Sequence, residues 1–183
     1  MALVYIASKT ASADATLSFT SGIDATYNEY QFHFVNMHPA TDNVDFEFQV
    51  NAAGASGFNE PMITTAFGAN HQEGDGYAAL GYQADHDQAT AGANNGLYQP
   101  IIGYSQGNGN DESLSGVLTL YNPSSTTYVK HFTSRGSAYH YPNAADDSFM
   151  AGYINTTAAI DEISFAFESG NIDAGTIHMY GVG

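Results

Sequence analysis

The sequence of 183 residues has the length of one domain and carries 19 acidic residues against three basic ones, a formal net charge of −16. Proteins that bind nucleic acids need clustered Lys and Arg, and an anionic membrane surface repels an acidic chain, so this composition disfavours both partners. Because the sequence has no cysteine, it excludes disulfides and thiolate metal sites, and we expect residues 1–183 to form a single domain.

The chain opens with a short apolar run that no positively charged segment precedes, which is not the pattern of a secretory signal. No other stretch approaches the roughly 18 apolar residues of a membrane-spanning helix. We therefore expect a soluble protein that does not insert into a membrane.

Most of the sequence alternates between apolar and polar residues with the period of a β-strand that is buried on one face. The clearest alternations place these residues on the apolar face: Tyr30, Phe32 and Phe34; Phe46, Phe48 and Val50; Ile163, Phe165 and Phe167. About ten short strands are expected, near residues 3–8, 15–20, 27–36, 44–51, 61–67, 98–104, 114–121, 126–134, 148–155 and 161–168. This spacing predicts an all-β, jelly-roll-like antiparallel β-sandwich.

Turn residues connect the expected strands. Between the strands near 114–121 and 126–134, Asn122 and Pro123 occupy the first two positions expected of a type I turn. Residues 170–175 form a glycine-bounded turn before a closing strand, in which Ile177 and Met179 point to the core while His178 faces outward with Thr176 and Tyr180. We expect deletion of residues 176–183 to unfold the domain.

The region from 68 to 112 does not follow this rhythm, because it is rich in Gly, Asn, Asp, Gln and Ala. Such a stretch contains either functional loops or strands whose pattern is too weak to recognise. The best helical candidate, residues 76–89, is interrupted by Gly81, so we expect one helical turn there at most.

This loop-rich region supplies the candidate ligand-binding residues. Tyrosine provides rigid amphipathic contact area, and the segment at 84–88 places two carboxylates beside a histidine, where hard oxygen ligands could hold Ca²⁺. The alternatives are a solvated loop and tyrosines at the rim of the core, and the segment lacks the EF-hand pattern. The candidate residues are Tyr77, Tyr82, Asp85, His86, Asp87 and Tyr98.

Motifs of catalysis are not found. None of the seven histidines has zincin spacing, and the sequence has no Gly-x-Ser-x-Gly elbow and no phosphate-binding glycine loop. His33, His131 and His178 are interpreted as outward strand residues. We therefore expect no enzyme, no catalytic residue, no metal and no cofactor; a hydrolase would need a histidine beside a nucleophile or a carboxylate pair in these loops.

Two of the three basic residues, Lys130 and Arg135, lie close together in the sequence. They could contact an anion at a subunit boundary. The favoured interpretation is intramolecular pairing with nearby carboxylates, worth under about 1 kcal/mol for each exposed pair.

Three segments, SGIDATYNEYQFHFVNMHPATD (21–42), NPSSTTYVKHF (122–132) and GYINTTAAIDEISFAFESGNIDAGTIHMYGV (152–182), resemble small β-rich virion structural proteins of tailed bacteriophages. In that group a Gly-Ile-Asp turn leads into a Tyr-rich strand, and a Gly-x-Ile-x-Met/Leu-Tyr-Gly strand follows at the end. The resemblance implies a head decoration protein or a tail, baseplate or fibre accessory, made in the host cytoplasm and assembled on the virion. It also implies other virion proteins as partners and a homo-oligomer, with a trimer favoured. The alternative is a carbohydrate-binding adhesin that holds a host-surface glycan with the loop tyrosines and acidic residues.

Overall fold

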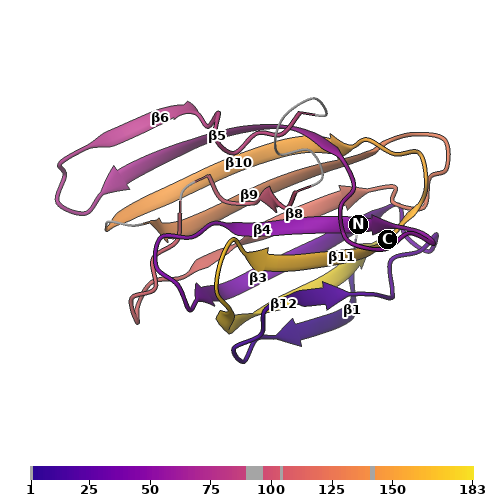
Figure 1. Ribbon diagram of the computed structural model, residues 1–183, viewed down its shortest axis with the longest axis horizontal. Coiled ribbons are helices and arrows are strands. Elements are labelled where there is room, and N and C mark those ends of the chain that lie inside the picture. Colours follow the sequence, from indigo (N-terminus) through magenta and orange to yellow (C-terminus); the bar gives the residue numbers. More distant parts are fainter. Residues whose placement is uncertain (1, 90–96, 104, 141–142) are drawn as a thin grey trace.

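A computed structural model describes residues 2–89, 97–103, 105–140 and 143–183. Within these residues the chain forms twelve strands and no helix, and nothing in them could span a membrane as a helix. Two antiparallel sheets pack together, so the expected all-β sandwich is confirmed. Figure 1 shows the smaller sheet lying over part of the larger one, with β5 and β6 at the upper edge of the view and β1 at the lower edge.

The larger sheet has eight strands, whose neighbours pair antiparallel. Their spatial order is β1 (Leu3–Thr10), β12 (Ile172–Val182), β3 (Glu29–Pro39), β8 (Leu114–Tyr121), β9 (Lys130–His140), β10 (Ala144–Ile154), β5 (Met62–Gln72) and β6 (Ala78–Tyr82). The smaller sheet has the order β2 (Leu17–Phe19), β11 (Ile160–Phe167), β4 (Phe46–Ala52) and β7 (Gln99–Pro100).

The core lies between the two sheets and is rich in phenylalanine. Phe34 of β3 contacts Phe46 of β4 with ring centroids 5.4 Å apart, and Phe32 of β3 contacts Phe165 of β11 at 5.6 Å. Edge-to-face and tilted pairs of this kind add to the stabilisation from burial alone. The predicted apolar faces of these strands are therefore the buried ones.

The hairpin between β8 and β9 confirms the predicted turn but corrects where the second strand begins. The backbone N–H of Ser125 donates to the carbonyl of Asn122 at 3.1 Å, which closes the turn. However, β9 begins at Lys130 rather than near residue 126. The intervening segment is held by Lys130 instead of by strand pairing, since its Nζ donates to the carbonyls of Ser125, Tyr128 and Thr156 at 3.0, 3.1 and 3.0 Å.

Strand β6 is one of the two alternatives expected for the 68–112 region, a strand whose pattern is too weak to recognise, and it replaces the single helical turn allowed for residues 76–89. All five of its residues are exposed, which leaves no alternation for a sequence pattern to detect. These residues form a strand because they pair with β5, which extends to Gln72. The strand expected near 98–104 is reduced to β7, and residue 104 lies outside the described residues.

Strand β12 lies inside the larger sheet, between β1 and β3. Ile177 and Met179 are fully buried, whereas His178 and Tyr180 are half-buried on the opposite face, as predicted. His178 lies opposite His33 of β3, whose ring is 4.9 Å from that of Tyr180.

Candidate functional site

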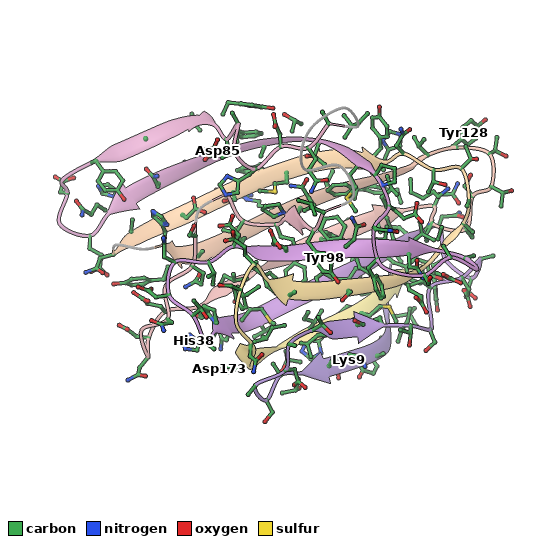
Figure 2. The ribbon with its side chains drawn as sticks, viewed as in Figure 1. Lys9, His38, Asp85, Tyr98, Tyr128 and Asp173 are labelled. Atoms are coloured by element: carbon green, nitrogen blue, oxygen red, sulfur yellow. The ribbon has the colours of Figure 1, made fainter. Side chains whose placement is uncertain are left out.

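The structure brings four of the six candidate residues together around one pocket. Asp85, His86, Asp87 and Tyr98 line a pocket of about 390 Å³. We call it the acidic pocket, and its complete lining is Asp45, Glu47, Asp85, His86, Asp87, Gln88, Leu97, Tyr98, Pro100 and Glu168. Figure 2 labels Asp85 and Tyr98, which come from separate segments between β6 and β7.

The other two candidates lie elsewhere. Tyr77 is in the turn before β6, where its carbonyl accepts a hydrogen bond from the N–H of Gln72. Tyr82 lies on β6 opposite Phe67, and its hydroxyl donates to the carboxylate of Asp87. This hydrogen bond raises the pKa of Tyr82. Tyr82 thus contacts one acidic residue of the pocket without lining it.

Residues in and next to three neighbouring strands of the smaller sheet, β11, β4 and β7, form one side of the acidic pocket. Asp45 directly precedes β4, Glu47 belongs to β4, and Pro100 belongs to the paired edge strand β7. Glu168 follows β11, the other neighbour of β4. The segment after β6 then brings Asp85 against these strands.

Buried amide side chains fix the segment after β6 in place. The backbone of Gln88 exchanges hydrogen bonds with Thr64 of β5, and its Nε2 donates to the carbonyls of Leu97 and Tyr98 at 3.2 and 2.9 Å. Gln99 accepts from the hydroxyl of Thr64 at 2.8 Å and donates to the carbonyl of His86 at 2.8 Å. These contacts give a loop-like sequence a defined path.

His86 contacts Asp45 inside the pocket, with Nε2 and Oδ2 3.1 Å apart. The hydroxyl of Ser105 donates to the other oxygen of Asp45 at 3.0 Å. Burial acts to lower the pKa of His86, but the hydrogen bond to Asp45 and the nearby charges of Asp45, Asp85 and Asp146 outweigh it and raise that pKa. Ser105 and His86 thus share a carboxylate partner, an arrangement that orients the imidazole without activating the hydroxyl.

Among the residues that line the pocket, Glu47 has the most strongly shifted pKa. Burial, followed by the neighbouring carboxylates of Asp45 and Glu168, raises its pKa from 4.5 to about 8, and His86 opposes this only in part. At neutral pH the carboxyl group of Glu47 is therefore mostly protonated.

Sequence reasoning missed Asp45, Glu47, Gln88 and Glu168. Asp45 and Glu47 lie on the outward phase of a correctly predicted strand, so their pattern indicates solvent exposure. They become partly buried because the segment of residues 85–88 packs near them, and its path depends on hydrogen bonds between distant residues. The one feature of the sequence that could have indicated this pocket is the number of carboxylates close to predicted strand ends.

The geometry of the described ranges gives no support to a metal site, while the loop histidine that lies beside carboxylates in the acidic pocket is His86. Across these ranges, no group of three or more His, Asp or Glu side chains is arranged to hold a metal ion. His71 contacts Asp75 at 3.0 Å at an exposed position, and Nδ1 of His140 lies 2.9 Å from the carbonyl oxygen of Ser105. Neither contact joins a histidine to a nucleophilic hydroxyl or thiol.

The two clustered basic residues have different roles. Arg135 pairs with both oxygens of Asp147 at 3.0 and 2.9 Å, which confirms the favoured interpretation for this residue. For Lys130 that interpretation was wrong, because its partners are not carboxylates. The side chain is fully buried and donates hydrogen bonds to three backbone carbonyls. Burial lowers the pKa of Lys130.

A second surface feature crosses the solvent-facing side of the larger sheet. Four small residues in register on adjacent strands form its floor: Thr119, Thr133, Ala151 and Thr65. Two grooves of about 410 and 370 Å³ share Thr65, Thr133 and Ala151 in their linings, so they are halves of one depression. We call it the outer trough.

Rows of larger side chains form the walls of the outer trough. On one side the row is Val117, Arg135, Phe149, Phe67 and Tyr82, and on the other it is His131, Tyr153 and Ile63. The rings of Phe67 and Phe149 stack with centroids 4.9 Å apart, and the Arg135 guanidinium lies 4.6 Å from the Phe149 ring centre. Stacking of this kind holds the wall rigid.

The outer trough is nearly uncharged, although the chain has a net charge of −16. Arg135 is the one formally charged residue in its three described rows, and it is paired with Asp147. The wall residue Phe67 is 47% exposed, an unusual position for a phenylalanine, which proteins mostly bury.

No family model, no curated protein and no solved structure matches this chain. The acidic pocket and the outer trough are therefore interpreted from their own chemistry.

Proposed function

We propose that this chain is a non-enzymatic structural protein of a tailed-phage virion, a surface module that assembles as an oligomer through the solvent-facing side of its larger sheet. The observation that carries the proposal is the outer trough, where the exposed rings of Phe67 and Tyr82 stand in register with the half-buried ring of Phe149 across β5, β6 and β10. Large exposed apolar patches on soluble proteins mark interaction surfaces. The sequence resemblance supplies the virion context.

Charge supports the same surface as the interface. Two copies of a chain with net charge −16 repel each other, and the repulsion is least where a nearly uncharged surface meets its partner. Eight strands spaced about 4.8 Å apart and about eight residues long present a face of roughly 900 Å². A stable interface buries about 800 Å² on each partner, so the interface would have to extend from the outer trough over most of this face.

Light scattering and sedimentation on the purified protein test the assembly, and we expect a closed oligomer, with a trimer favoured. Phe67→Ser and Tyr153→Ser, one in each wall, should dissociate it. Tyr128→Ser is the matched control, because Tyr128 is 71% exposed but lies in the loop before β9, as Figure 2 shows. A monomeric wild-type protein that is absent from purified particles would refute the proposal.

Binding of a host-surface glycan is a second candidate function, which the construction of the outer trough favours. Threonine hydroxyls on the floor could hydrogen-bond to sugar hydroxyls, while the aromatic walls pack against apolar sugar faces. This places the glycan away from Tyr77, Asp85, Asp87 and Tyr98. A glycan array with and without calcium tests it, and absence of binding in both conditions would remove this candidate.

A further inference from the structure

The acidic pocket is a concentration of hydrogen-bond acceptors. Five carboxylates line it, from Asp45, Glu47, Asp85, Asp87 and Glu168, and no Lys or Arg is among the described lining residues. Burial, together with repulsion from the carboxylates of Asp45 and Glu168, raises the pKa of Glu47 to about 8, so this carboxyl group is mostly protonated at neutral pH. A positive charge in the pocket would relieve that repulsion.

Buried acceptor atoms without partners give an independent indication of a ligand. Gln88 is only 4% exposed and lines the pocket, and its Oε1 has no hydrogen-bond partner, although its Nε2 has two. Nδ1 of His86 is also buried without a partner. Buried acceptors are normally satisfied, so the unpaired Oε1 of Gln88 calls for a donor.

The remainder of the lining distinguishes an organic cation from a metal ion. Leu97, Tyr98 and Pro100 provide an apolar and aromatic side, which a metal ion cannot use. A guanidinium on an aliphatic stem uses both sides, since its five N–H groups reach several acceptors while its stem packs on apolar surface.

We propose that the acidic pocket binds the guanidinium group of an arginine side chain that a protein partner inserts. The identity of that partner as a virion protein rests on the proposed function, whereas binding of the arginine side chain does not. The pocket is a second contact point, distinct from the outer trough.

Calorimetric titration of the purified protein at low ionic strength tests the inference. The probe is N-acetyl-arginine-N-methylamide, which presents an arginine side chain without free termini. Its control is the citrulline analogue, which has nearly the same shape and no charge. We expect the arginine derivative to bind at least about tenfold more tightly, because a charge-assisted contact to buried acceptors is lost with citrulline. Equal affinity for both probes, or no binding of either, would overturn the proposal.

Substitutions of surface carboxylates distinguish binding in the pocket from a general attraction of the cationic probe to an acidic protein. Glu168→Gln and Asp85→Asn each remove one exposed carboxylate of the pocket and should weaken binding about threefold or more. Asp173→Asn removes the same charge from an exposed position on β12, at the opposite side of the molecule in Figure 2, and should leave binding unchanged. If Asp173→Asn weakens binding as much as Glu168→Gln does, the site is not the pocket.

Proton release provides a second readout. The groups that face Glu47 are Asp45, Glu168 and His86, and an arriving cation should lower the raised pKa of Glu47. Binding at pH 7 should therefore release a fraction of a proton, visible as heats that differ between buffers of different ionisation enthalpy. Glu47→Gln should reduce the release to the part that His86 contributes, and a release that Glu47→Gln leaves unchanged would overturn the placement of the guanidinium beside Glu47. Particle association is measured separately, so the two proposals can fail independently.

Discussion

At the scale of single residues, Glu47 shows how a surface position on a strand can acquire the environment of a buried one. Its place in β4 follows from the alternation with Phe46 and Phe48, but its neighbour Glu168 comes from another segment, the end of β11. The result is a carboxyl group whose ionisation opposes folding.

We predict that Glu47→Gln stabilises the protein in alkaline solution. The unfolded chain ionises this group above about pH 4.5, while the folded chain keeps its proton until about pH 8, so stability is lost progressively across that window. Glutamine removes the loss, which should be worth about 1–2 kcal/mol at pH 8 after allowance for solvent screening, and nothing near pH 4. Urea unfolding at both pH values measures the difference, with Asp173→Asn as the control. A difference that does not depend on pH would contradict the assignment.

Lys130 is the second residue whose role depends on distant groups. We predict that Lys130→Met destabilises the protein by about 2–4 kcal/mol, because three backbone carbonyls lose the charged donor that a fully buried Lys130 supplies. Lys9→Met is the matched control at an exposed position and should change stability by less than about 0.5 kcal/mol. Thermal and urea unfolding compare the two variants, and equal effects would refute a structural role for Lys130.

At the scale of elements, β12 is an inner strand of the larger sheet that holds β1 to the rest of it. It pairs with β1 on one side and β3 on the other, and it buries Ile177 and Met179. Removing it would expose these contacts and leave β1 without its neighbour.

Deletion of residues 176–183 should therefore abolish cooperative unfolding and the near-ultraviolet signal of packed tyrosines. His178→Ala, within the same strand, should change the unfolding free energy by less than about 0.5 kcal/mol, because its side chain lies on the solvent-facing side. Burial and the charge of His178 lower the pKa of His33, so the same variant should raise that pKa in an NMR titration. A folded deletion variant would contradict the role assigned to β12.

Strand β6 shows the limit of pattern reading for elements. The alternation that identifies β3, β4 and β11 arises because one face of each is buried, and β6 buries neither face. Its Ala and Gly residues also have low intrinsic preference for strands. Only its partner β5 makes it a strand, and no local property of residues 78–82 encodes that pairing.

At the scale of the whole molecule, strand positions and the sandwich class could be predicted from the sequence, whereas the division into eight and four strands could not. Phe34 and Phe46 identify buried faces, but nothing local indicates that β3 and β4 belong to different sheets. The same limit applies to the sites. Asp85, His86, Asp87 and Tyr98 are close in sequence, whereas Glu47 and Glu168 join them only through the fold.

The net charge of −16 predicts how the whole molecule responds to salt. Like charges repel more in the compact state than in the unfolded chain, and salt screens that repulsion. Raising NaCl from about 0.05 to 0.5 M should therefore raise the unfolding free energy by about 1 kcal/mol. Urea titrations at the two concentrations measure it, and an unchanged or lower midpoint would show that self-repulsion is not a significant cost.

The pairing of β1 has a consequence for the order of events during synthesis. Residues 3–10 find their strand partner only in residues 172–182, so they must wait until nearly all the intervening chain has left the ribosome. Until then β1, with Leu3, Val4 and Tyr5, stays unpaired, and β3 remains an edge of the larger sheet. The closing step of folding is therefore the docking of β12 on β3, which also gives β1 its partner.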